Sequence, residues 1–154
     1  MAIEGVGGLG HLAIQFANKF GFNVAAISRG PENASLAEQL GAHHYINSHA
    51  TSVAEELQKM GGARVILATA PSGKSKSALV DGLATNGKML VVGASPEPIE
   101  VSPVQLIRGR RSIQGWPSGA PADSEDTLRF AVLSGIRPMI ERSLSPAPTK
   151  PMSA

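Results

Sequence analysis

The chain has 154 residues, which is enough for one α/β domain with a hydrophobic core. A formal net charge of only +2 does not call for a nucleic-acid or membrane surface, and the lack of cysteine excludes disulfides, thiolate zinc sites and cysteine nucleophiles within this sequence. No apolar run approaches the roughly 20 residues of a membrane span, and no signal peptide precedes the first predicted strand. These features predict a soluble, cytoplasmic protein.

The most informative motif stands at the beginning of the sequence. Gly5, Gly7 and Gly10 follow the pattern G-x-G-x-x-G, with Gly8 and Leu9 between the last two. The first glycine permits a tight turn, the second lets the backbone approach a pyrophosphate, and the third lets a helix pack closely on the sheet. The pyrophosphate would rest on free N–H groups at the helix N-terminus.

The residues around this motif give it more weight than the pattern has alone. A short strand is predicted over residues 2–4, and apolar residues recur at helical spacing from Leu9 to Phe20, where Gly21 stops the helix. Residues 22–27 then form an apolar run typical of a buried strand. Strand, glycine turn, helix and strand follow in the order of a βαβ unit, which disfavours the alternative of a glycine turn that binds nothing.

The rest of the sequence continues to alternate between strands and helices. Further strands are predicted at 43–46, 64–68, 88–92 and 112–114, and further helices at 33–40, 52–60, 74–84, 102–107 and 123–134. Six strands with helices between them predict an α/β fold with a doubly wound parallel sheet, the Rossmann fold, as a single domain over residues 1–142. The proline-rich residues 143–154 are predicted to be an irregular or disordered tail.

The residues after the second predicted strand indicate which dinucleotide is bound. An acidic residue at this place usually accepts hydrogen bonds from the adenosine ribose and selects NAD. The sequence here reads Ser28-Arg29-Gly30, with no acidic residue. Ser28 and Arg29 would donate to a 2′-phosphate, so we expect NADP rather than NAD. The alternative is that Arg29 is a solvated loop residue.

A second motif suggests a different nucleotide. Residues 68–75 resemble a phosphate-binding loop for a nucleoside triphosphate, with Ala68 in place of the first glycine before Gly73-Lys74-Ser75. Three points weigh against it: the missing glycine, the N–H donor that Pro71 removes, and the absence of a partner strand ending in an aspartate for Mg²⁺. The alternative interpretation is that these residues form a loop that lines the dinucleotide cleft and binds no triphosphate.

Two smaller groups of residues carry weaker signals. The four histidines, which are His11, His43, His44 and His49, form no recognised metal spacing, and we expect them at the surface or at strand ends. The basic cluster of Arg108, Arg110 and Arg111 is expected at a solvated edge.

Four segments together resemble a known family. Residues 5–13, Leu40-Gly41-Ala42, residues 91–93 and residues 112–115 are similar to the cofactor domain of zinc-type medium-chain alcohol dehydrogenases. The Ser28-Arg29 pair resembles the NADP-preferring, cinnamyl-alcohol-type branch of that family. The similarity extends from Ala2 to about Arg142, and it implies reversible hydride transfer between a nicotinamide cofactor and an alcohol or aldehyde.

The resemblance also assigns roles to individual positions. It places Gly7, Gly8 and Leu9 against the pyrophosphate and Ser28 and Arg29 against the 2′-phosphate. It places four further residues beside the adenosine or nicotinamide half, namely Thr69, Val92, Gly93 and Ala94. The sixth strand commonly pairs two subunits edge to edge in this family, which implies a homodimer.

The sequence departs from the family in two ways. The family's catalytic domain lies mostly before the glycine motif and supplies the zinc ligands, and this sequence contains none of it. Asn33 stands where NADP-preferring members often have a lysine. We therefore expect an NADP-binding domain of an alcohol dehydrogenase that is catalytically incomplete as this chain. The alternative is a non-catalytic NADP-binding or regulatory module.

Overall fold

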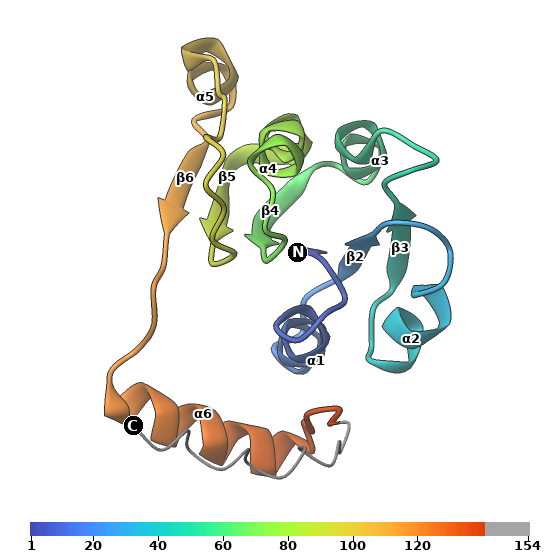
Figure 1. The fold of residues 1–154 in the computed structure, drawn as a ribbon, viewed down its shortest axis with the longest axis vertical. Helices are drawn as coiled ribbons and strands as arrows, with labels where there is room; N and C mark the ends of the chain where they lie inside the picture. The colour runs from blue at the N-terminus through green and yellow to red at the C-terminus, as the bar shows by residue number, and fades with distance from the viewer. Residues whose placement is uncertain (141–154) are drawn as a thin grey trace, which may run out of the picture.

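The computed structural model describes residues 1–140, and within them one parallel sheet forms the centre of the molecule (Figure 1). Its strands are β1 (Ala2–Glu4), β2 (Ala25–Ser28), β3 (His44–Asn47), β4 (Ala63–Ala68), β5 (Leu83–Val91) and β6 (Ser112–Gly115). They pair in the order β3-β2-β1-β4-β5-β6, and every pair is parallel. The predicted doubly wound α/β fold is confirmed. The tail predicted at 143–154 and the domain boundary at 142 lie outside the described residues.

Helices cover both faces of the sheet. They are α1 (Gly10–Lys19), α2 (Ala34–Gln39), α3 (Val53–Lys59), α4 (Gly73–Leu79), α5 (Pro103–Gly109) and α6 (Pro121–Ser134). Figure 1 shows α1, α2 and α6 on one side of the sheet and α3, α4 and α5 on the other. This distribution follows from right-handed crossovers that run in opposite directions from the centre. No helix within residues 1–140 is long and apolar enough to cross a bilayer.

Two local signals in the sequence start helices where they were expected. The Ser52 hydroxyl accepts the Glu55 backbone N–H at 3.5 Å at the beginning of α3. The Ser102 backbone N–H donates to Gln105 Oε1 at 2.8 Å at the beginning of α5. Both contacts satisfy N–H groups that the first turn of a helix leaves without intrahelical partners.

The sheet has a hydrophobic core on each face. Successive side chains of a strand point to opposite faces, and Ala2 and Ile3 of β1 are both fully buried, one in each core. Ile66 belongs to the core under α3 and α4, and Ile14 of α1 belongs to the opposite one. Burial on both faces is what a central parallel strand requires, and it places the carboxyl end of β1 in the middle of the sheet edge.

The helix predicted at 74–84 ends earlier than expected. The helix α4 stops at Leu79, a single 3₁₀ turn (η1) covers Val80–Gly82, and β5 begins at Leu83. Leu83 is fully buried and pairs with Ala63 of β4. Sheet pairing and burial of this leucine therefore override the local preference for helix, which sequence spacing alone did not reveal.

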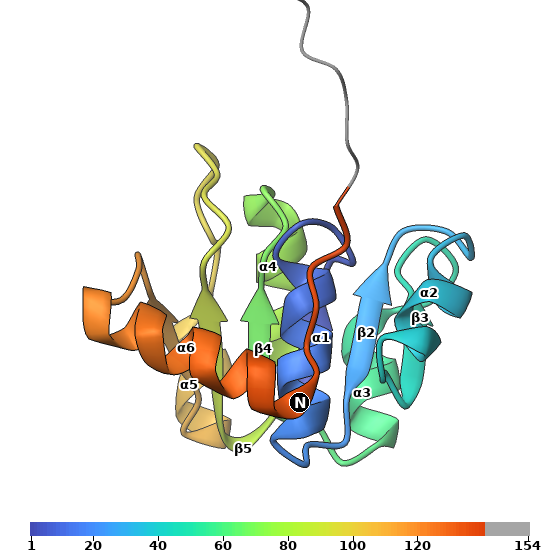
Figure 2. The same cartoon turned by 90° about the horizontal axis from the view of Figure 1, so that it is seen from below.

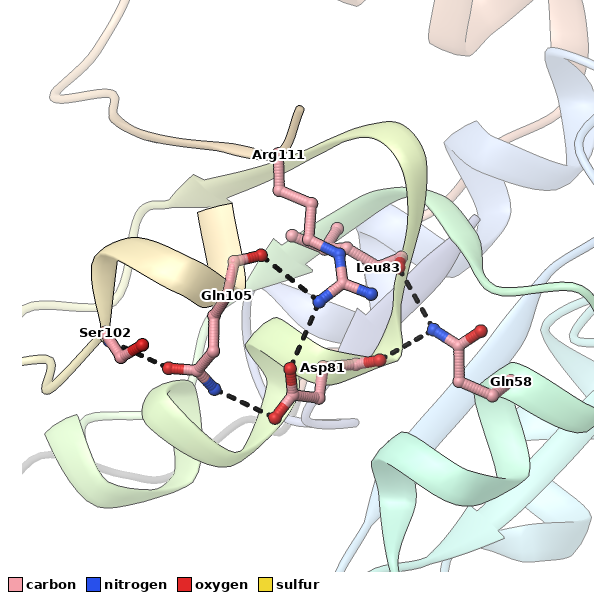
Figure 3. A network of polar contacts seen from close by, with 6 residues as sticks. All are labelled: Gln58, Asp81, Leu83, Ser102, Gln105 and Arg111. Carbon is pink, nitrogen blue, oxygen red and sulfur yellow. Dashed lines mark hydrogen bonds and ion pairs between the residues drawn. The ribbon is translucent and has the colours of Figure 1, made fainter. Parts of the chain in front are cut away.

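A polar network joins η1 to the neighbouring elements (Figure 3). Arg111 Nη1 donates to Asp81 Oδ1 at 3.1 Å, and Gln105 Nε2 donates to Asp81 Oδ2 at 2.8 Å. Gln58 of α3 donates to the backbone oxygens of Asp81 and Leu83 at 2.6 and 3.0 Å. Because the Arg111 side chain is only 15% exposed, the expectation of a solvated arginine was wrong at this position.

The helix α6 lies across the α1 side of the sheet and makes little contact with it (Figure 2). None of its residues is buried, and the apolar side chains Leu128 and Val132 are 67% and 82% exposed. Its main contact is the Phe130 ring, which stacks on Phe20 and Phe16 of α1 with centroid distances of 4.6 and 5.8 Å. The α6 helix is thus attached through α1 and leaves much of its apolar surface in solvent.

Candidate dinucleotide-binding site

The glycine turn follows β1. Two of its glycines are in close backbone contact with each other, and two others border open space. Gly5 has φ of +93°, and a Cβ on Gly10 would lie 1.9 Å from the Gly5 carbonyl oxygen. The start of α1 therefore sits directly on the turn, with no room for a side chain. Gly7 and Gly8 are exposed, and a Cβ on either would meet nothing within 4 Å. The space beside both glycines is therefore open, and a contact with a pyrophosphate there stays a prediction.

A cleft of about 1340 Å³ opens above this turn, at the carboxyl ends of β1, β2 and β4. Its volume exceeds the range typical of drug-sized ligands, which suits an extended dinucleotide. The sequence-predicted residues that line it are Gly5, Gly7, Gly8, Leu9, Ser28, Arg29 and Thr69. The structure thus brings together the residues expected at the pyrophosphate and the adenosine ribose.

Four other predicted residues do not line this cleft. They are Gly10, which is buried in α1, and Val92, Gly93 and Ala94, which follow β5. The segment after β5 packs against the end of β4, because the Gly93 N–H donates to the Ala68 oxygen at 3.0 Å and a Cβ on Gly93 would lie 2.3 Å from the Thr69 oxygen. A contact between these three residues and the cofactor stays a prediction.

The turn after β2 is braced by residues at the end of β3. The Ser28 carbonyl oxygen accepts hydrogen bonds from the backbone N–H of Ser48 at 2.9 Å and from its hydroxyl at 3.3 Å. The Gly30 N–H donates to Asn47 Oδ1 at 3.0 Å, and the Tyr45 hydroxyl donates to the Gly30 oxygen at 2.7 Å. Protein groups therefore satisfy the Ser28 carbonyl and both backbone groups of Gly30, and the side chains of Ser28 and Arg29 line the cleft.

The charge around the cleft is mainly positive. Arg29 is exposed on one wall and takes part in none of the ion pairs found within residues 1–140. Lys74, at the beginning of α4, lines the cleft as well. The acidic side chain among the lining residues is Glu4, which is only 5% exposed. This arrangement favours an anionic ligand.

The loop before α4 resembles a phosphate-binding loop in sequence, but its polar groups are bonded to side chains of this protein. Lys76 is 1% exposed, and its Nζ donates to the backbone oxygens of Ala70 and Ser72 at 2.7 and 3.4 Å. The Gly73 N–H donates to Glu97 Oε2 at 3.2 Å. A carboxylate at this helix start would repel a phosphate, which weighs against a triphosphate. The loop lines the cleft, as the alternative interpretation of this sequence predicted.

Glu4 is a buried carboxyl, and the sequence predicted only that its position belongs to a strand. It ends β1 directly before the glycine turn, and its Oε2 atom has no hydrogen-bond partner. Burial raises the pKa of Glu4 above its ordinary value of 4.5, while the Ser75 hydroxyl, the Lys76 charge and the Ala70 backbone act in the opposite direction. An acidic residue at the end of a strand that is otherwise apolar was the signal available in the sequence.

His11 is not at the surface, contrary to expectation. It lies in α1 and is 8% exposed, and its Nε2 accepts the Met139 N–H at 3.0 Å. The other nitrogen, Nδ1, then carries the proton and donates to the Gly7 oxygen at 3.1 Å. Gln15, one turn further on, exchanges two hydrogen bonds with the backbone of Arg137. These contacts hold the segment after α6 against α1, where Figure 2 shows it running along that helix. The hydrogen bond from His11 to Gly7 ties the same helix to the glycine turn.

This strand order, with a glycine turn at its centre and a cleft at the carboxyl ends, defines a doubly wound nucleotide-binding domain. The family described as "Zinc-binding dehydrogenase" matches residues 8–132, and the chain therefore belongs to that family. The predicted resemblance is confirmed. Membership of this family implies a nicotinamide dinucleotide and, in the complete enzymes, zinc.

The chain matches several named alcohol dehydrogenases over a part of their length. It is 42% identical over 142 residues to the alcohol dehydrogenase notN of Aspergillus sp. (strain MF297-2), covering 92% of this chain and 42% of that protein. A probable cinnamyl alcohol dehydrogenase 3 of Oryza sativa subsp. japonica is 34% identical over 146 residues, with 92% and 38% covered. The chain thus spans about two fifths of these relatives.

A solved structure shows the same arrangement in three dimensions. The cinnamyl alcohol dehydrogenase SbCAD4 of Sorghum bicolor superimposes with a TM-score of 0.80 at 34% identity, covering 91% of this chain and 39% of that one. The zinc that the family implies has no matching ligand set in the part of the chain that the structure describes, where no three His, Cys, Asp or Glu residues gather as a metal site would need. The described residues fit the dinucleotide and do not fit the zinc.

The buried carboxyl of Glu4 makes stability depend on pH. Because its pKa is raised in the folded state, the stability it contributes is complete below about pH 4.5 and is lost as the pH rises through the folded pKa. Replacing Glu4 by glutamine removes this dependence. We expect Glu4→Gln to become more stable relative to the unchanged chain as the pH rises from 5 to 8, so that its free energy of unfolding minus that of the unchanged chain increases, as measured by urea denaturation.

Glu38→Gln, on the exposed surface of α2, is the matched control for losing one negative charge. A stability difference for Glu4→Gln that stays constant over the whole pH range would contradict this prediction.

Proposed function

We propose that the domain binds NADP(H) and serves an oxidoreductase that transfers a hydride between NADP and an alcohol or aldehyde. The observation that carries the proposal is the open space above Gly7 and Gly8, at the start of α1 and in the floor of the cleft. The family and the names of the relatives, which are alcohol dehydrogenases and cinnamyl alcohol dehydrogenases, support this class of reaction.

The preference for NADP over NAD is part of the same proposal. No carboxylate stands at the end of β2, where it would accept hydrogen bonds from a ribose and repel a 2′-phosphate. Ser28 and Arg29 face the cleft there instead. Glu32 lies against Gly30 in the following turn, but it is not one of the cleft-lining residues. The side chains of Ser28 and Arg29 can therefore both donate hydrogen bonds to the adenosine end.

The residues of this chain would bind and orient the cofactor. The backbone at Gly7 and Gly8 would meet the pyrophosphate, and the positive end of the dipole of α1 would favour its charge. Thr69 and the loop before α4 would enclose the adenosine side. When bound, the nicotinamide ring supplies the hydride chemistry, and the rest of the enzyme supplies the substrate pocket.

Arg29→Asp tests the cofactor preference. A carboxylate in place of the guanidinium repels the 2′-phosphate and removes a charge-assisted donor, for which about a tenfold or greater loss of NADP affinity is expected. NAD affinity should be unchanged or higher. Titration calorimetry with both cofactors measures the two values.

Arg108→Asp, on the exposed end of α5, makes the same change of net charge outside the cleft and should leave both affinities as they are. The proposed preference for NADP is wrong if Arg29→Asp also leaves the NADP affinity unchanged.

We propose further that the chain of 154 residues binds the cofactor without turning over an alcohol by itself. The support is the sequence, which has no cysteine, together with the lack of a metal-ligand group within residues 1–140. A positioned substrate and a polarising group are the main sources of rate in such reactions. A non-catalytic NADP-binding module remains the alternative function.

An assay of NADPH oxidation with a broad panel of aldehydes, with and without added zinc, should show no sustained turnover. Turnover by this chain alone would overturn the proposal that it is catalytically incomplete, and it would also exclude the non-catalytic module.

Pairing of two chains through β6 is the third part of the proposal. The strand β6 is an outer edge of the sheet, and its residues Ser112 and Gln114 are exposed and uncharged, so the edge has little to prevent pairing. Sedimentation equilibrium should give twice the chain mass of 15.9 kDa. Gln114→Lys, which places a charge on the edge strand, should shift the equilibrium toward monomer. A monomeric unmodified chain would contradict this pairing.

A further inference from the structure

We propose that Asn33 sets the specificity of the adenosine end, by holding the Ser28 hydroxyl so that its hydrogen is donated to a phosphate oxygen. The inference rests on the proposed preference for NADP and goes beyond it. It names a neutral residue that acts through a hydrogen bond, in addition to the charge of Arg29. Both Asn33 and Ser28 line the cleft.

The hydrogen bonds at Ser28 leave its O–H hydrogen available to a ligand. Asn33 Nδ2 donates to Ser28 Oγ at 3.0 Å, and the Ser28 carbonyl already accepts two hydrogen bonds from Ser48. A hydroxyl has one hydrogen and two lone pairs. With one lone pair taken by Asn33, the O–H hydrogen and the second lone pair of Ser28 remain for the cleft, and of these an anionic oxygen can pair only with the hydrogen.

Asn33 is itself held in place by the helix that it begins. Its carbonyl oxygen accepts the Ala37 N–H at 2.9 Å, and Ala37 is fully buried in the core beside α1. The Ala34 N–H donates to the Pro31 oxygen at 3.0 Å in the same turn. The backbone of Asn33 is therefore positioned by the packing of α2, and its side-chain amide is held by the hydrogen bond to Ser28 Oγ, an arrangement that lowers the cost of ordering when a ligand binds.

The direction of this hydrogen bond distinguishes the two cofactors. The oxygens of a 2′-phosphate accept hydrogen bonds, and they would find a hydroxyl hydrogen beside the guanidinium of Arg29. The free 2′-hydroxyl of NAD is best held by an acceptor such as a carboxylate. Ser28 with one lone pair occupied is a weaker acceptor. The pair of Asn33 and Ser28 therefore favours NADP without adding charge.

Two variants of Asn33 test this role. Asn33→Ala removes the donor, and Asn33→Asp keeps the shape but accepts the Ser28 hydrogen, which turns it away from the cleft. Aspartate is also a favourable residue at a helix N-cap, so α2 should persist. Asn23→Asp, an exposed position before β2 at the opposite end of that strand, adds the same charge away from the cleft.

The probes are adenosine 2′,5′-bisphosphate and 5′-AMP, which differ only in the 2′-phosphate, and their affinities for the whole chain are measured by calorimetry. We expect Asn33→Ala to weaken the bisphosphate about two- to tenfold and Asn33→Asp to weaken it more than tenfold. Both variants should leave 5′-AMP unchanged. In a Ser28→Ala background, Asn33→Ala should have no further effect, because the hydrogen bond is already absent.

The outcomes separate the two proposals. If the unchanged chain binds the bisphosphate no more tightly than 5′-AMP, the preference for NADP is wrong. If that preference is present and is lost in Arg29→Asp, but both Asn33 variants keep it, the role of Asn33 is wrong and the proposed function stands. If the Asn33 variants weaken both ligands equally, Asn33 is only a structural cap of α2, which also overturns this inference.

Discussion

The contact on which the rest of the structure depends is the approach of the first residue of α1 to the turn after β1. At Gly10 a Cβ would lie 1.9 Å from the Gly5 oxygen, so the helix can begin there only with a glycine. This contact directs the N-terminus of α1 into the cleft and fixes the helix on the central strand. From that helix His11 and Gln15 hold the segment after α6, and a phenylalanine stack holds α6 itself. One close backbone contact thus positions both the site and the outer layer.

Below the cleft, two buried ionisable side chains organise the loop before α4. The ammonium of Lys76 binds two carbonyl oxygens of that loop, and the carboxyl of Glu4 lies at the end of the neighbouring strand. Burying such groups is unfavourable unless they are paired and hydrogen-bonded, and Lys76 meets that condition only while the loop keeps the conformation that presents the Ala70 and Ser72 oxygens. A loop held in this way can line a cofactor site without being ordered by the cofactor.

Much of the fold was predictable from sequence because its signals are local. The glycine spacing, the apolar spacing in α1 and the capping residues Ser52 and Ser102 act within a few residues, and each appears in the structure where it was expected. The errors concern long-range contacts. The start of β5 at Leu83 depends on pairing with β4, and the burial of Arg111 depends on Asp81, which is 30 residues away. Such contacts leave no periodic pattern in the sequence.

The sequence by itself determined the alternation of strands and helices, the glycine turn, and the donor character of Ser28 and Arg29, because each depends on residues that are neighbours along the chain. Only the tertiary structure decided which distant residues share the cleft. It joined Asn33 and Ser48, from two separate loops, and Lys74, from the first turn of α4, to the glycine turn, and it buried Glu4 beneath them. The physical reason is that parallel strands bring their carboxyl ends together at one edge in an order set by the packing of whole helices, which no local pattern records.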